Sequence, residues 1–356
     1  GSEMCIRDRD GAKCVNCGLC LEVCSYNHSE IALNELPKVS YGAWSKEKSV
    51  RHICASGGVG FEIGRYLIGK GYKAIGVKYD VKRAKAEHYV ASSVDEFILS
   101  MGSKYIQSYT LSGFKEINRK DKFLVSGTPC QIDSLRRYIN KMKCQENFVL
   151  LDFFCHGVPS KFVWDKYIKE QQDKLGNIDF VSWKNKQNGW HDSWAMTISP
   201  LDRGEVVDWY DSYNLLIKEK KGCVNSRWTQ GDTFYNMFLG NNCLGKACYK
   251  YCKFKYDHSS ADIRIGDMWG ETYAKEDKGV TACVAFTQQG MDVLNNVNCE
   301  LVEYPFARVA EGQIKTKIKY PMGWSFVIFF AKLQSVSMKQ LVFFSRIIGK
   351  FNKIFK

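Results

Sequence analysis

The pattern of apolar positions predicts alternating strands and helices through the middle of the chain. Residues 122–126 and 148–154 are short, almost continuous apolar runs, as expected of strands buried on both faces. Helical periodicity follows each run, over residues 131–138 and 161–172. A strand, helix, strand, helix order places the two strands parallel in one sheet, with a right-handed crossover. The sequence therefore predicts an α/β fold.

Weaker patterns extend this core in both directions. Residues 74–79 and 86–90 are expected to form a strand hairpin, residues 261–267 a further strand, and residues 59–67 and 93–101 helices. Residues 36–42, which include Pro37 and Gly42, are interpreted as a linker. We expect a mixed or parallel sheet flanked by helices over residues 45–310, after a small ferredoxin-like segment over residues 10–36. A helical tail over residues 320–356 completes the expected organisation.

Composition limits the compartment and the class of partner. Fifteen cysteines in 356 residues, without an amino-terminal apolar segment, indicate a reducing compartment, which we interpret as the cytoplasm. The formal net charge is +13, but lysines are spread along the chain and no motif for DNA or RNA recognition is present. We therefore expect no nucleic-acid partner. A basic surface also suits an acidic electron-transfer protein or a phosphorylated substrate.

The carboxyl-terminal residues 324–356 combine apolar bursts at helical spacing with six Lys or Arg and no acidic residue. The longest uninterrupted apolar run, residues 326–331, is far shorter than the roughly 20 residues that cross a bilayer. One interpretation is a basic amphipathic helix that contacts a membrane surface. The other is a helix packed against a partner subunit in an oligomer, and the sequence leaves both open.

The most specific chemical signal is a cysteine run with the spacing C-x2-C-x2-C-x3-C, as in bacterial-type ferredoxins that hold [4Fe-4S] clusters. Its members are Cys14, Cys17, Cys20 and Cys24. Gly18 permits the tight turn that wraps successive thiolates around one cluster. A zinc knuckle rarely has four cysteines this close together, and a disulfide framework does not suit a long chain without a secretory signal. The run therefore predicts an iron-sulfur cluster.

One departure limits that prediction. In two-cluster ferredoxins the fourth cysteine of such a run serves the other cluster and usually precedes proline. Here Ser25 follows Cys24, and no second run of this kind is nearby. Either all four cysteines bind one cluster, or a companion half that should precede residue 10 is missing. Residues 1–9 resemble a cloning remnant and are excluded from fold reasoning.

A second cysteine set follows from the predicted sheet. Cys130 and Cys155 each come just after a parallel strand, so both thiols should lie at the sheet edge where open α/β folds bind ligands. Cys248 and Cys252 could face one metal site from a turn, and Cys243 competes for one position. The alternative is a pair of buried structural cysteines. The remaining thiols are interpreted as ordinary: Cys54, Cys144, Cys223, Cys283 and Cys299.

Two small segments have the composition of anion-binding loops. Residues 56–58 place two glycines before a predicted helix, and residues 102–105 combine Gly102 with Lys104. Such glycines often mark only a tight turn. The polar, tryptophan-flanked turn at residues 182–190 fits packing better than a site. His156 and His191 are candidate proton donors, although a structural role fits each of them better.

Several motifs occur together in a specific order along the chain. They are Ser56-Gly57-Gly58, Gly102-Ser103-Lys104-Tyr105, Gly127-Thr128-Pro129-Cys130-Gln131, Cys155-His156-Gly157-Val158-Pro159-Ser160, Gly189-Trp190, the Cys248/Cys252 pair and Ile265-Gly266-Asp267-Met268-Trp269-Gly270. As an ordered set they resemble the coenzyme F420 hydrogenase/dehydrogenase beta subunit family, over roughly residues 10–300. Each motif alone would be unspecific.

The resemblance implies an iron-sulfur flavoprotein oxidoreductase with FAD beside a [4Fe-4S] cluster. It implies cluster ligands at Cys130, Cys155, Cys248 and Cys252. It places FAD at Ser56, Gly57, Gly58, Gly102, Ser103, Lys104, Tyr105, Gly127 and Thr128. Many relatives have two residues rather than three between the last two cysteines, which keeps Cys243 in contention. No catalytic residue is assigned.

The resemblance also implies a redox partner such as ferredoxin. Relatives with an amino-terminal ferredoxin region usually have two cysteine runs, and this chain keeps only the second. With that run, the chain would carry one or two [4Fe-4S] clusters. The acceptor stays open among a deazaflavin, a tetrapyrrole and a glycan-pathway intermediate. An alternative function is an electron-transfer adaptor subunit of a larger redox complex, without a substrate of its own.

Overall fold

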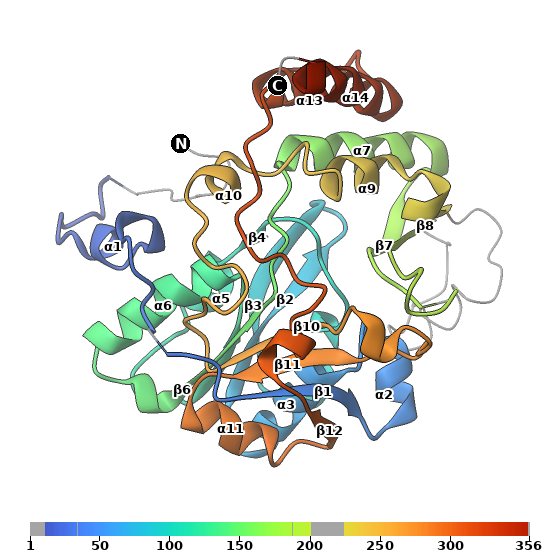
Figure 1. The fold of residues 1–356 in the computed structure, drawn as a ribbon. Helices are drawn as coiled ribbons and strands as arrows, with labels where there is room; N and C mark the ends of the chain where they lie inside the picture. Colours follow the sequence, from blue (N-terminus) through green and yellow to red (C-terminus); the bar gives the residue numbers. More distant parts are fainter. Residues whose placement is uncertain (1–10, 34, 187, 201–223, 355–356) are drawn as a thin grey trace.

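The computed structural model describes residues 11–33, 35–186, 188–200 and 224–354. Residues 1–9, interpreted as a cloning remnant, and the thiol of Cys223 lie outside this part of the chain. Within it, nine strands form one mixed sheet and three form a small antiparallel sheet (Figure 1). The larger sheet has the order β12 (Cys299–Glu303), β1 (Val39–Ser45), β11 (Thr281–Ala285), β10 (Ile263–Asp267), β6 (Phe148–Phe153), β5 (Phe123–Ser126), β2 (Lys73–Asp80), β3 (Lys85–Ala91) and β4 (Ser108–Tyr109). The smaller sheet has the order β7 (Ile178–Ser182), β8 (Ala195–Pro200) and β9 (Val224–Arg227).

The centre of the larger sheet is parallel. Strand β5 pairs in parallel with β6 and with β2, and β6 pairs in parallel with β10. The helix after β5 is α6 (Pro129–Lys141), and the helix after β6 is α7 (Lys161–Leu175). The expected parallel pair, the β2–β3 hairpin and the α/β class are therefore confirmed. The carboxyl ends of β5, β6 and β10 consequently meet at one edge.

The interpretation of residues 36–42 as a linker is wrong. Residues 39–42 belong to β1, which lies between β11 and β12 and pairs antiparallel with both. Gly42 serves this strand rather than a turn, since a Cβ at this position would lie 2.8 Å from the Met268 sulfur. The sheet therefore begins at Val39, before the expected domain start at residue 45.

Helices cover both faces of the larger sheet. The alternation within β5 and β6 turns Leu124 and Val149 toward α3 (Val59–Gly69) and α11 (Gln288–Leu294). Their neighbours Phe123 and Phe148 face α6 and α5 (Leu111–Phe114) on the other side, where the two rings stack at 5.5 Å. The short helices near this sheet are α2 (Lys48–Ile53), α4 (Val94–Phe97), α12 (Phe306–Val309) and the 3-10 turns η2 (Ile98–Ser100), η3 (Gln145–Asn147) and η5 (Glu271–Tyr273). This packing of helices on both faces of the sheet fixes where the loops after the strands begin.

A second hydrophobic core lies between α7, the small sheet and the carboxyl-terminal helices. Its largest buried side chains include Trp164, Trp183 and Phe234. The helices around it are α9 (Thr233–Phe238), α13 (Trp324–Lys332) and α14 (Met338–Ile354), with η4 (Trp228–Gln230) beside them. In Figure 1, α13 and α14 form the uppermost layer, outside α7 and α9. The remaining helices of the described residues are α1 (Leu19–Glu22), η1 (Ser25–Asn27) and α10 (Lys246–Lys250).

Candidate functional site

Two cysteines lie at the carboxyl edge of the parallel strands, as expected. Cys130 is in the first turn of α6, which begins with a capping box between Thr128 and Gln131 and with Pro129 at its start. The Thr128 hydroxyl lies 3.2 Å from the Cys130 sulfur. Cys155 comes two residues after the end of β6. Local helix capping and strand pairing thus place both thiols at the same edge.

Cys248 reaches this edge because its segment is attached to the chain just after Cys155. The backbone amide of Gly245 donates to the Val158 carbonyl at 2.8 Å, and Ser160 donates to the Cys243 carbonyl at 2.7 Å. The Val158 amide in turn donates to the Cys248 sulfur at 3.4 Å. Tertiary pairing therefore brings together cysteines that are more than ninety positions apart in the sequence.

The four thiols Cys130, Cys155, Cys248 and Cys252 lie close enough to interact electrostatically. Burial is the largest cause of the raised pKa of Cys130, of the pKa of about 12 at Cys155 and of the strongly raised pKa of Cys248. Each of these pKa values is raised further by other thiolates of the group. The Lys255 ammonium partly offsets this rise at Cys155. We call these four residues the sheet-edge thiol group.

The sheet-edge thiol group suits an iron-sulfur cluster in its chemistry. Four thiolates at such a buried place require positive charge, which a metal group supplies. Among the described residues, no three His, Cys, Asp or Glu side chains are grouped closely enough to hold a single metal ion. A zinc ion draws its sulfur ligands to about 2.3 Å, whereas a cube spreads them over several metal atoms. Ligation itself stays a prediction.

Cys243 lies apart from this group. Its side chain is fully buried in the second core, and burial is the one cause of its raised pKa, without a contribution from the other thiols. The backbone around Cys243 points its carbonyl, rather than its sulfur, toward the Cys155 loop. The geometry therefore favours Cys248 and Cys252 over Cys243 as ligands.

The amino-terminal cysteine run is a turn and a short helix on the outside of the protein. Gly18 adopts a left-handed conformation, with φ of 75°, at the start of α1. Cys17 and Cys20 are exposed, Cys14 is half-buried and Cys24 is buried against the body of the protein. The run thus presents one side to solvent and ends at a buried thiol.

The residues after Cys24 fasten this run to the body of the protein. The Lys253 ammonium donates to the backbone carbonyls of Ser25 and His28 at 3.0 and 2.8 Å. The Ser25 amide donates to the Ser134 hydroxyl on α6 at 3.0 Å. Lys253 directly follows Cys252, so one cation ties the amino-terminal run to the sheet-edge thiol group.

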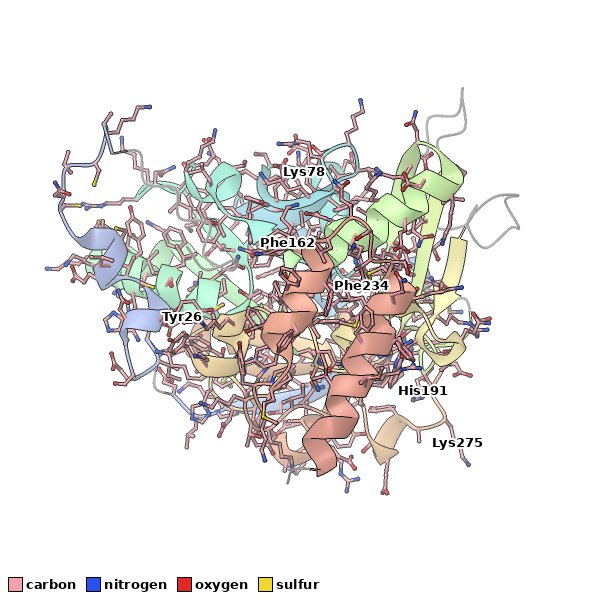
Figure 2. All side chains as sticks on the ribbon, turned by 90° about the horizontal axis from the view of Figure 1, so that it is seen from above. Tyr26, Lys78, Phe162, His191, Phe234 and Lys275 are labelled. Carbon is pink, nitrogen blue, oxygen red and sulfur yellow. The ribbon has the colours of Figure 1, made fainter. Side chains whose placement is uncertain are left out.

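Tyr26 lies between the two cysteine sets. Its hydroxyl forms a hydrogen bond with the Cys130 thiol, and its ring meets Tyr251 edge-on at 6.4 Å. Figure 2 labels Tyr26 at the place where the amino-terminal segment reaches the body of the protein. Because Cys24 is only two residues away, the amino-terminal run and the sheet-edge thiol group are neighbours in space.

A cavity of about 550 Å³ lies at the same sheet edge. This volume is in the range of small-molecule and cofactor sites. Cys155 and His156 are part of its wall, so the cavity borders the sheet-edge thiol group. The residues expected at FAD that line it are Ser56, Gly58, Gly102, Ser103, Lys104, Tyr105, Gly127 and Thr128. Three loops that are far apart in the sequence thus meet at one cavity.

Gly57, also expected at FAD, has another role. It is buried behind the lining, and its amide donates to the Thr281 hydroxyl at 3.0 Å. A Cβ here would lie 2.3 Å from the Ala43 carbonyl, so only glycine fits. Its neighbour Gly58 has a φ of 89° and begins α3, whose first turn lines the cavity. Gly57 therefore supports the loop from behind the cavity wall and does not face the cavity.

Lysines beside the cavity have unusual protonation equilibria. Burial lowers the pKa of Lys104 to about 7 and that of Lys186 to about 7. Lys104 donates to the carbonyls of Leu99 and Met101, and Lys186 donates to the carbonyl of Ser56. Both lysines interact with Cys54, whose pKa burial raises to about 12. These cations both support the loop backbone and place positive charge near the cavity.

The sequence did not identify the aromatic wall of the cavity as part of the site. Asp267 accepts a hydrogen bond from the Trp190 indole at 2.7 Å and forms an ion pair with the buried Lys184 ammonium. Trp190 stacks on Trp269 at 4.6 Å, and Trp269 and Trp194 line the cavity. The turn at residues 182–190 has a packing role, as expected, and it supports this wall from behind. The one sequence signal for the wall was the motif from Asp267 to Gly270.

The two candidate histidines differ in position. His156 is on the cavity wall with its ring 4.9 Å from Phe238, and burial lowers its pKa to about 4. It is therefore neutral at physiological pH. His191 is exposed, and its Nε2 lies 3.1 Å from the Tyr273 carbonyl. Neither geometry assigns a proton-transfer role.

A buried ion pair holds the sheet edge together beneath these loops. Arg264 on β10 and Asp152 on β6 are both fully buried, and their two parallel hydrogen bonds measure 2.8 and 2.7 Å. Arg264 also donates to the carbonyls of Tyr256 and His258, in the segment between Cys252 and β10. This pair therefore connects the Cys155 strand to the segment that follows Cys252.

Comparison with known proteins identifies a family whose model matches about half of the chain. Residues 120–304, which are 185 of the 356 residues, match the model for the C terminus of the family described as "Coenzyme F420 hydrogenase/dehydrogenase, beta subunit". This match includes the whole sheet-edge thiol group and the Gly127 loop. A search of curated proteins finds no match. A chain of the F420-reducing [NiFe] hydrogenase complex from Methanosarcina barkeri is similar over 90% of this chain and 94% of that chain, with 15% identity and a TM-score of 0.49.

Proposed function

Since this chain belongs to the coenzyme F420 hydrogenase/dehydrogenase beta subunit family, we propose that it is an iron-sulfur flavoprotein oxidoreductase. It would pass electrons between a ferredoxin-like donor, [4Fe-4S] clusters, FAD and a two-electron acceptor of undetermined identity. The observation that carries this proposal is the meeting of the sheet-edge thiol group with three glycine-bearing loops at one cavity. The thiol-rich composition supports a reducing, cytoplasmic setting for this proposed activity.

The donor sets suggest which residues would hold each group. Cys130, Cys155, Cys248 and Cys252 would bind one cluster, and the amino-terminal run from Cys14 to Cys24 would bind another. The cavity loops would hold FAD, with Gly57 acting as a backbone spacer. A bound flavin exchanges single electrons with clusters and electron pairs with a hydride acceptor, which is why both groups belong in one site.

The protein's own side chains would position these groups and keep water out. The Lys104 ammonium offers positive charge for a phosphate or for a reduced ring. Trp269 and Trp194 give the cavity a rigid wall, held from behind by Lys184. The Tyr26 hydroxyl keeps the amino-terminal run beside Cys130. In this proposal the amino-terminal run is the entry point for electrons.

An adaptor subunit without its own substrate is the second candidate. It is favoured by the exposure of Cys17 and Cys20, which leaves the amino-terminal run open to a docking protein. The two candidates differ in one measurable property. Steady-state reduction of any small acceptor by the isolated chain would exclude the adaptor function.

Purification without oxygen, followed by an absorbance spectrum and by iron, sulfide and flavin assays, tests the main proposal. We expect one FAD and about eight irons per chain, as two four-iron clusters require. About four irons would mean that one of the two cysteine sets is empty. If Cys130→Ala then lost all of that iron, the amino-terminal run would be the empty set. Protein that carries iron but no flavin under these conditions would contradict the proposed function.

We predict that FAD affinity falls as the pH rises above about 7. The pKa of Lys104 is lowered to about 7, so the free protein loses this charge above that pH. A bound phosphate favours the ammonium form, and binding must then take up a proton, which weakens affinity by up to about tenfold per pH unit. Below pH 7 Lys104 is charged before and after binding, so the profile should be flat.

Titration of flavin fluorescence between about pH 6 and about pH 9 measures this effect. Lys104→Met should bind FAD more weakly at low pH and lose the dependence. Lys115→Met, which removes an exposed ammonium elsewhere, should keep the wild-type profile. An unchanged pH profile in Lys104→Met would assign the dependence to another group.

A further inference from the structure

Basic residues occur along the whole chain, but most of the net positive charge comes from the carboxyl end, where no acidic residue balances them. Residues 312–356 contain nine Lys or Arg and no Asp or Glu. The other 311 residues contain 42 basic and 38 acidic residues, so they contribute only +4 to the net charge of +13. This end of the chain therefore differs from the rest in its electrostatics.

The same region forms a helical hairpin with a fixed position. Val327, Ile328 and Leu341 are buried toward the second core, and α13 and α14 pack on α7 and α9. The Lys166 ammonium donates to the carbonyls of Leu333 and Val336 in the hairpin turn, at 2.7 and 2.5 Å. The apolar inner face of the hairpin is thus buried against the rest of the protein, and carbonyls of its turn accept hydrogen bonds from Lys166.

The outer face of the hairpin is apolar where a surface helix would be polar. Phe326, Phe329 and Phe343 are 63%, 57% and 59% exposed, and Ile347 is also exposed. Figure 2, seen from above, shows α13 and α14 side by side across the face nearest the viewer. Helices that are apolar on both sides need a second apolar environment, and a patch of this kind marks a contact surface.

Exposed cations accompany these rings. Lys332, Lys339 and Arg346 are exposed along the two helices. Large apolar side chains beside Lys and Arg, with no carboxylate, are typical of helices that lie in the interface of an anionic membrane. In the described part of the chain, no helix has the length and apolarity that crossing a bilayer requires. These features fit a contact that lies on the surface.

We propose that the outer face of the α13–α14 hairpin docks on an anionic lipid surface, with Phe326, Phe329 and Phe343 among the headgroups. The cations would then meet lipid phosphates. A second copy of this chain fits the surface less well, because it would bring the same positive charge to the contact. An acidic protein would neutralise the charge, but three large rings without hydrogen-bonding groups suit lipid better.

Vesicle co-sedimentation of the full chain tests this proposal, independently of its iron and flavin content. We expect binding to vesicles of phosphatidylglycerol and phosphatidylcholine in equal parts, and at least about tenfold weaker binding to phosphatidylcholine alone. High salt should weaken the binding to the anionic vesicles. Equal binding to both vesicle types, or none to either, would overturn the proposal.

Matched variants separate the hairpin from the rest of the surface. The double variant Phe329→Asp and Phe343→Asp changes two exposed residues and should lose at least about tenfold in vesicle binding. The control Leu111→Asp and Val302→Asp adds the same charge at exposed positions outside the hairpin and should bind like wild type. Equal loss in both variants would contradict a specific surface. The proposal would also be contradicted if the wild-type protein formed a dimer and the hairpin variant were a monomer, because a second copy would then cover this face.

Discussion

Replacing Cys130 with alanine is expected to remove about four irons per chain, half of the total that the proposed function requires. Cys130 is the member of the sheet-edge thiol group that also contacts Thr128 and Tyr26, so its loss would expose the proposed cluster on the side of the amino-terminal run. Iron and sulfide assays on protein purified without oxygen measure the loss. Flavin is measured in the same sample to show whether the cavity is intact.

Cys243→Ala is the matched control for this experiment. Cys243 is a buried thiol in the same region, but its pKa carries no contribution from the other cysteines. We expect this variant to keep its full iron content and to lose only a little stability. If Cys243→Ala lost four irons while Cys248→Ala kept them, the ligand set inferred from the geometry would be wrong.

Replacing Arg264 with methionine is expected to lower the free energy of unfolding by about 3–5 kcal/mol. The substitution leaves the Asp152 carboxylate buried without its two hydrogen bonds from the guanidinium, and it frees the carbonyls of Tyr256 and His258. Urea unfolding of the purified chain measures the change. Asp152→Leu combined with Arg264→Met should cost less than the single variant, because no unpaired charge remains.

Arg83→Met provides the comparison at the surface. Arg83 pairs with Asp80 and Glu87, but its side chain is 57% exposed, so its removal should lower the free energy of unfolding far less than the removal of Arg264 does. A similar cost for the two arginines would show that the buried pair does not hold the sheet edge. It would also weaken the inference that this pair positions the segment after Cys252.

The parallel centre of the sheet could be predicted because its signals are local. The apolar runs of β5 and β6, each followed by helical periodicity, fix the strand type and direction without reference to the rest of the chain. Cys130 and Cys155 follow from the same reasoning, since they come directly after those strands. The structure confirms this part of the fold.

Strand β1 shows where local signals fail. Pro37 and Gly42 suggested a linker, yet residues 39–45 pair with β11 and β12, which lie about 240 and 260 positions later in the sequence. Strand pairing at such separation depends on partners that no local pattern reveals. The aromatic wall of Trp194 and Trp269, with Asp267 beside it, was missed for the same reason.

By itself, the sequence determined the α/β class, the amino-terminal cysteine run, the positions of Cys130 and Cys155 after their strands, and the glycine-bearing loops. Strand runs, cysteine spacing and turn residues are local properties. Only the tertiary structure decided that Cys248 joins Cys130 and Cys155 while Cys243 turns into the second core, and that Gly57 supports the cavity from behind. It also placed Tyr26 between the two cysteine sets. These placements depend on which distant segments pair across the sheet edge, and packing decides that pairing only once the whole chain has folded.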